Sequence, residues 1–149
     1  MDYRKYNDTY YICFYKGDEV LQGILDLCKK EHITSAIYSG IGGCSSAELQ
    51  IFDPETGAFE TEEITGMLEL LSLNGNIICD EAQNLYQHAH AVFSYKKDGV
   101  HSVTGGHMKS ITIRYVAEIE LRPVIGGEIR RLPDPETGTG FWAFPEPNE

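Results

Sequence analysis

The hydrophobic and polar positions of this chain alternate mostly with the two-residue period of β-strands. Residues 9–16 and 111–121 are dense in β-branched and aromatic side chains, which favour strands. Further strands are predicted at 35–39, 47–52, 58–65, 67–73, 85–95 and 100–104. Short turn sequences separate these runs, so we expect mainly antiparallel pairing between neighbours.

One segment has the period of a helix instead. Apolar side chains recur at helical spacing over residues 20–31, at Val20, Leu21, Ile24, Leu25, Leu27 and Cys28. We expect Asp18 to cap this helix, with Glu19 in the first turn and Lys29 and Lys30 in the last turn. The predicted fold class is therefore α+β, a mainly antiparallel sheet with one principal helix near the N-terminus.

The glycine-rich segment 39–46 resembles a phosphate-binding loop only superficially. It lacks the Walker lysine and the third glycine of the dinucleotide fingerprint, and no helical pattern follows it. We expect a tight connection between the strands at 35–39 and 47–52, where two backbones approach closely. The alternative is that its backbone amides line a pocket.

The chain length of 149 residues predicts one domain, which we place at residues 1–132, followed by a proline-rich tail at 133–149. The tail contains Phe141, Trp142 and Phe144. Three aromatic side chains in a loop-like segment need a surface to pack on. That surface is either the domain itself or a neighbouring subunit.

Charge and cysteine content narrow the function classes. The 12 Lys and Arg against 23 Asp and Glu give a net charge of −11, which argues against direct, unaided nucleic-acid binding, although a local basic patch remains open. The four cysteines form no C-x-x-C pair, so we expect buried free thiols in a cytoplasmic protein. No apolar run approaches the about 20 residues that cross a bilayer, and no signal sequence precedes the first strand.

Three histidines carry the best candidate chemistry. His88 and His90 lie two residues apart in a predicted strand and therefore point to the same face. His107 follows the predicted hairpin turn at 96–99. A two-residue loop at Asp98 and Gly99 places His107 opposite His90, and a four-residue loop places it opposite His88. A three-residue loop turns His107 to the other face, because a one-residue slip exchanges the faces of a strand.

Three neutral imidazoles with an open fourth position suit a catalytic divalent metal, with zinc first and nickel, iron or copper as alternatives. A water molecule at that position ionises near neutral pH and acts as a nucleophile. The competing interpretation is that His88 and His90 are half-buried strand residues with backbone partners.

Other chemistry-bearing residues offer weaker candidates. Glu69 lies among apolar neighbours and is either a general base near the metal or a solvent-facing carboxylate. Arg114 is either an anion anchor or a surface cation. Cys44 has no identifiable base, and His32 and His101 are expected at the surface.

The chain resembles the plants-and-prokaryotes-conserved (PPC) domain family over residues 10 to 122. The resemblance rests on SGIGGCSSAELQIFD at 39–53, ELLSLNGN at 69–76, HAH at 88–90, GGHM at 105–108, and AEI at 117–119. It implies an α+β domain that forms a homotrimer. Prokaryotic members carry the pattern matched here by His88, His90 and His107, and the fold is similar to zinc-dependent acetolactate decarboxylase.

Two functions follow from these observations. The first is a metal-dependent hydrolase or lyase acting on a small oxygen-rich molecule, with Glu69 transferring protons. The second is a homotrimeric DNA-binding or transcription-associated module, because plant relatives join this domain to AT-hooks. This sequence contains no AT-hook motif.

Overall fold

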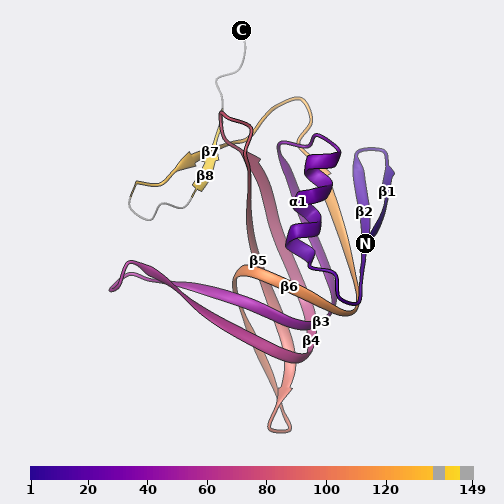
Figure 1. Ribbon diagram of the computed structural model, residues 1–149, viewed down its shortest axis with the longest axis vertical. Coiled ribbons are helices and arrows are strands. Elements are labelled where there is room, and N and C mark those ends of the chain that lie inside the picture. The colour runs from indigo at the N-terminus through magenta and orange to yellow at the C-terminus, as the bar shows by residue number, and fades with distance from the viewer. Residues whose placement is uncertain (136–139, 145–149) are drawn as a thin grey trace.

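The computed structural model describes residues 1–135 and 140–144. Within these residues, one helix and eight strands follow one another (Figure 1). They are β1 (Asp2–Tyr6), β2 (Thr9–Tyr15), α1 (Val20–Lys30), β3 (Ala36–Asp53), β4 (Ala58–Cys79), β5 (Leu85–Lys97), β6 (Val100–Pro123), β7 (Arg130–Pro133) and β8 (Gly140–Ala143). None of the helical segments in the described part of the chain is long and apolar enough to span a bilayer.

The four long strands pair in a closed ring. β3 pairs with β4, β4 with β5, β5 with β6, and β6 returns to β3, all antiparallel. β2 joins the far end of β6, and β1 forms the outer edge beyond it. The predicted α+β class, with a mainly antiparallel sheet and one early helix, is confirmed.

Several expected breaks between strands are wrong. Residues 39–46 lie inside β3, and the runs 58–65 and 67–73 belong to one strand, β4. The runs 100–104 and 111–121 likewise merge into β6. Register shifts between Gly40 and Gly42, and between Cys44 and Ser46, allow β3 to bend without ending. The close approach predicted for this segment is real, since a Cβ at Gly42 would collide with Ala117 of β6.

The N-cap of α1 lies one residue later than predicted. Glu19 is the N-cap, and its carboxylate accepts hydrogen bonds from the backbone N–H groups of Leu21, Gln22 and, on β6, Ile111. Asp18 instead accepts from the N–H of Tyr15 and pairs with the N-terminal ammonium at 2.7 Å. The longer glutamate reaches both the helix and the sheet, which ties the start of α1 to β6.

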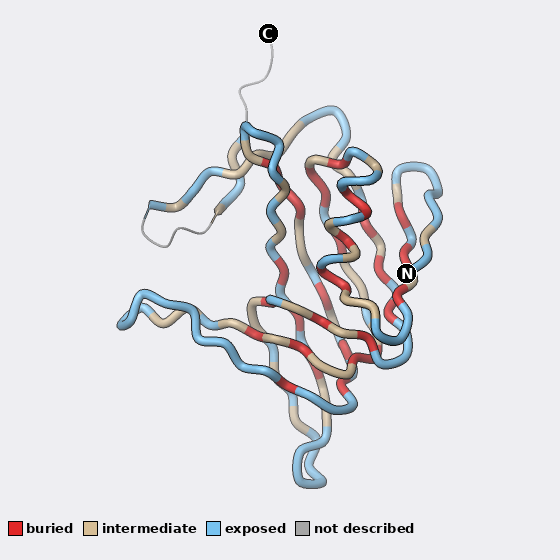
Figure 2. Tube along the Cα trace, viewed as in Figure 1, coloured by how far each residue is buried: buried red, intermediate tan, exposed pale blue. Residues whose placement is uncertain are grey.

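The core lies between α1 and the sheet, whereas the ends of the two long hairpins extend into solvent (Figure 2). Side chains from β2, α1 and all four long strands meet there, including Phe14, Ile24, Cys44, Leu73, Phe93 and Ile113. Cys28, Cys44 and Cys79 are buried free thiols, as predicted, while Cys13 is half-buried.

The predicted boundary at residue 132 falls inside β7, which pairs with β8 of the tail and joins the end of β4 through Cys79 and Arg130. Trp142 lies on β8 and remains 44% exposed. Part of the tail, including most of the DPETG sequence at 134–138, falls outside the described residues, and the expected boundary at residue 132 stays a prediction.

Candidate metal centre

Strand alternation places His88 and His90 on the outer face of β5. Ala89, Ala91 and Phe93 alternate with them and are buried in the core. The two histidine side chains are exposed, on the face that the core does not use. This is the arrangement that the two-residue period predicts.

The turn between β5 and β6 decides where His107 points. Lys97 pairs with Val100, so Asp98 and Gly99 form a two-residue loop with φ values of 52° and 80°. These positive values are typical of the hairpin turns that match strand twist. The register runs without a bulge from there to a direct pairing of His90 with His107. The two-residue alternative is therefore the one the structure adopts.

The three imidazoles converge at the point where the sheet divides. His107 pairs with His90 of β5 and also with Gln50 of β3, so β6 changes partner at this residue. The Nε2 atoms of His88 and His90 lie 3.1 Å apart, and one nitrogen from each of the three rings lies within 4.8 Å of the others. Ligand nitrogens around a tetrahedral zinc ion are about 3.3 Å apart, so small side-chain rotations bring this cluster to coordination geometry.

The surroundings favour the neutral imidazoles that bind metals. Although His88 is exposed, partial desolvation of its ring lowers its pKa, and the nearby His90 lowers the pKa further. Burial also lowers the pKa of His107, with added effects of the other two rings. Within the described residues, the three side chains make no hydrogen bond to the protein except the one between His88 and His90. The backbone partners of the competing interpretation are not found there.

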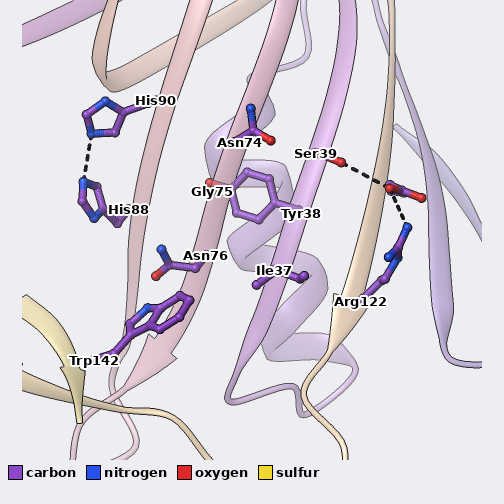
Figure 3. Close-up of a pocket in the computed structure, with 11 residues that line it drawn as sticks. Ile37, Tyr38, Ser39, Asn74, Gly75, Asn76, His88, His90, Arg122 and Trp142 are labelled. Carbon is purple, nitrogen blue, oxygen red and sulfur yellow. Dashed lines mark hydrogen bonds and ion pairs between the residues drawn. The ribbon is translucent and has the colours of Figure 1, made fainter.

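Two hollows flank the histidines. The first, which we call the polar groove, has a volume of about 450 Å³ and extends from His88 and His90 across β4 and β3 to β6 (Figure 3). The second, the aromatic pocket, has a volume of about 600 Å³ and includes Phe52, Phe59 and Tyr86. His88 and His90 line both hollows. A ligand bound at the cluster therefore has the polar groove on one side and the aromatic pocket on the other.

The other predicted candidates lie apart from this cluster. Glu69 pairs with Ser94, about 13 Å along β5 from His90, and lines neither hollow. Arg114 is exposed and stacks on Tyr115. Cys44 is buried, and burial raises the pKa of its thiol to about 12, which removes it as a nucleophile at neutral pH.

His32 and His101 are exposed, as predicted. Asn74 and Asn76, which sequence reasoning did not propose as site residues, line the polar groove, and so does Trp142, for which the sequence predicted only a packing surface. The two asparagines alternate along β4 at the spacing of His88 and His90, and this shared period was the available signal.

Comparisons with known proteins agree with this fold. The family model described as the Plants and Prokaryotes Conserved (PCC) domain, also written PPC, matches residues 1–124. A PPC protein from Pyrococcus horikoshii is 30% identical, with a TM-score of 0.79 and coverage of 97% of this chain and 95% of that one. No curated protein matches the chain.

Two further solved structures are similar over nearly their whole length. A protein from Ralstonia eutropha, provisionally named DNA-binding, is 28% identical with a TM-score of 0.83, and 96% of each chain is covered. A protein from Archaeoglobus fulgidus, described as metal-containing, is 26% identical with a TM-score of 0.78, covering 96% of this chain and 99% of that one. On the family match and this fold, the chain belongs to the Plants and Prokaryotes Conserved domain family.

Proposed function

We propose that His88, His90 and His107 hold one divalent metal ion, with zinc as the first candidate, and that this ion serves a hydrolase or lyase reaction on a small molecule. The observation that carries the proposal is the convergence of three imidazole nitrogens within 4.8 Å on an accessible face. A metal ion held by these residues would act as a Lewis acid that polarises a carbonyl group, or it would lower the pKa of a water molecule.

The chain's own residues contribute binding and access. The lowered pKa values of His88 and His107 keep both rings neutral and ready to coordinate. The two hollows leave the cluster open to a small molecule on either side. The similarity to the metal-containing Archaeoglobus protein supports the presence of an ion.

The test is the metal content of the purified protein by mass spectrometry. We expect about one ion per chain after growth in metal-replete medium. His90→Ala should lose the ion. His101→Ala is the matched control, because His101 lies exposed on the same hairpin and should leave the content unchanged. Metal-free wild-type protein would end the proposal.

We also propose that the chain forms a homotrimer. An exposed apolar patch surrounds Gly43 and consists of Ile41, Met67, Leu71, Tyr115 and Val116. Apolar side chains gathered in this way commonly mark a subunit interface. Light scattering should give about 50 kDa, three times the chain mass of 16.7 kDa. A mass equal to one chain would contradict the trimer.

Glu69 lines the same hollow as this patch. Its predicted role in proton transfer therefore requires a neighbouring subunit to bring the carboxylate to the histidines.

The predicted cytoplasmic location is supported by four free cysteines, which suit a reducing compartment.

A second candidate function is association with DNA or with a DNA-bound partner. The name of the Ralstonia relative favours it, whereas the net charge of −11 opposes direct contact. Direct binding should weaken steeply with salt, because it depends on neutralised phosphates. A gel-shift titration that shows no complex at low salt would exclude direct contact.

A further inference from the structure

Two rows of side chains cross the outer face of the sheet beside the histidines. Cross-strand pairing defines both rows, one as His90, Asn74, Ser39 and Glu120, the other as His88, Asn76, Ile37 and Arg122. The residues of each row lie on four neighbouring strands, so the rows span about 14 Å between their ends. All eight residues line the polar groove.

The far end of the groove carries no net charge. The guanidinium of Arg122 donates to the carboxylate of Glu120 at 2.8 Å, and the hydroxyl of Ser39 donates to the same oxygen at 3.3 Å. The positive charge is therefore offset before any ligand arrives. A charged ligand gains little from this end of the groove.

The middle of the groove offers amide groups. The Asn74 amide donates to the hydroxyl of Ser72 at 2.8 Å, which leaves its carbonyl oxygen available. The side chain of Asn76 makes no hydrogen bond to any described residue, so both its donor and its acceptor are available. An amide presents these two groups side by side, which matches two adjacent hydroxyl groups that each donate and accept.

An aromatic ring stands at the end of the groove nearest the histidines. Trp142 of β8 lies beside Asn76 and His88, and its indole is partly exposed (Figure 3). A flat indole next to polar amides suits a ring that has one apolar C–H face and polar edges. The indole then packs on the face while the amides bind the edges.

We infer that the polar groove binds a neutral polyhydroxylated ring, of the monosaccharide class, with its hydroxyls on Asn76 and Asn74 and its C–H face on Trp142. One hydroxyl then points to the histidine cluster, and this contact alone rests on the proposed metal site. The groove volume of about 450 Å³ falls in the range of small-molecule sites.

Trp142 is the chain's single tryptophan, so its fluorescence and its indole N–H resonance report on the groove alone. Zinc-loaded protein should show a saturable change in both signals when titrated with D-glucose or D-ribose. Succinate, a charged molecule of similar size, should produce none in the metal-free protein, where its carboxylates have no ion to bind. No saturable change with either sugar, or a stronger response to succinate in the metal-free protein, would overturn the inference.

Asn76→Ala should weaken sugar binding by about 3- to 10-fold, as expected for a lost amide hydrogen bond, with the metal content unchanged. Gln22→Ala removes an exposed amide from α1 and should bind as the wild type does. Equal affinity of Asn76→Ala and wild type would overturn the inference.

Metal analysis of the same samples separates the two proposals. Protein that carries metal but binds neither sugar contradicts only the sugar site. Wild-type protein that contains no metal after purification but binds a sugar supports the sugar site and contradicts the metal proposal. Resistance of Trp142 fluorescence to acrylamide quenching would mean that another subunit covers the groove, and this would also overturn the inference.

Discussion

The two faces of β5 make opposite use of the same strand. Ala89, Ala91 and Phe93 point inward and are buried in the core. His88 and His90 alternate with them, point outward and make no hydrogen bond to the rest of the described protein. One face is packed and the other is open, although each residue is a direct neighbour of one on the opposite face.

This difference separates stability from chemistry. Packing on the inner face determines the free energy of folding, because buried apolar side chains contribute most of it. The outer face contributes little to folding and is free to carry ligands. Substitutions on the two faces should therefore act on different measurements.

The largest effect on stability is expected from Phe93→Ala. Phe93 is fully buried, and removing such a ring costs about 3–5 kcal/mol of unfolding free energy. Urea denaturation measures this loss. Val92→Ala, on the outer face, should cost well under half as much, and the folded fraction of Phe93→Ala should keep its metal. Similar losses of unfolding free energy in Phe93→Ala and Val92→Ala would contradict the distinction between the two faces of β5.

His107→Ala should lower metal affinity rather than stability. We expect metal affinity to fall by at least about 100-fold, beyond the effect of losing a residue that merely orients a ligand. The unfolding free energy of the metal-free protein should change by less than about 0.5 kcal/mol, as for surface substitutions. Competition with a chelator measures the affinity. Wild-type affinity in this variant would show that the hairpin register does not assemble the site.

A smaller effect is expected on how the unfolding free energy of the metal-free protein depends on pH. The pKa values of His88 and His107 are lowered by burial, so the native state binds fewer protons than the unfolded chain. This contribution to stability is fully present above about pH 6.5 and is lost as the pH falls toward the native pKa values. Urea midpoints at two pH values, above and below 6.5, should show the fall. His107→Ala should show less of it, and an equal fall would contradict this assignment.

Glu69→Gln is expected to have the smallest effect. Glu69 lies outside both hollows, so metal content and affinity should equal those of the wild type. A loss of metal would place the carboxylate at the site, through a neighbouring subunit. The oligomeric mass of this variant should be measured in the same experiment, because Glu69 lines the same hollow as the apolar patch.

Much of the histidine site was predictable because it depends on local rules. Alternation places His88 and His90 together, and the hairpin allows only a few loop lengths. The sequence left two registers that put His107 on their face. The left-handed conformations of Asp98 and Gly99 decide between them, because they close a loop of two residues.

The strand boundaries were less predictable, because bulges leave a weak trace in a single sequence. Glycines at 40, 42 and 43 suggest a connection when only neighbours along the chain are considered. In the fold, Gly40 and Gly42 lie against β6, and the strand continues through them. Pairing with a distant strand satisfies the backbone there, which a local pattern does not reveal.

The sequence by itself determined the fold class, the early helix and the face shared by His88 and His90, because periods of two and 3.6 residues are properties of neighbouring positions. Only the tertiary structure decided which strands distant in the sequence lie side by side. It brought Asn76, Arg122 and Trp142 to one groove beside the histidines, from segments far apart in the chain. The reason is physical: pairing between distant strands depends on the packing of the whole core, and no short stretch of sequence contains that information.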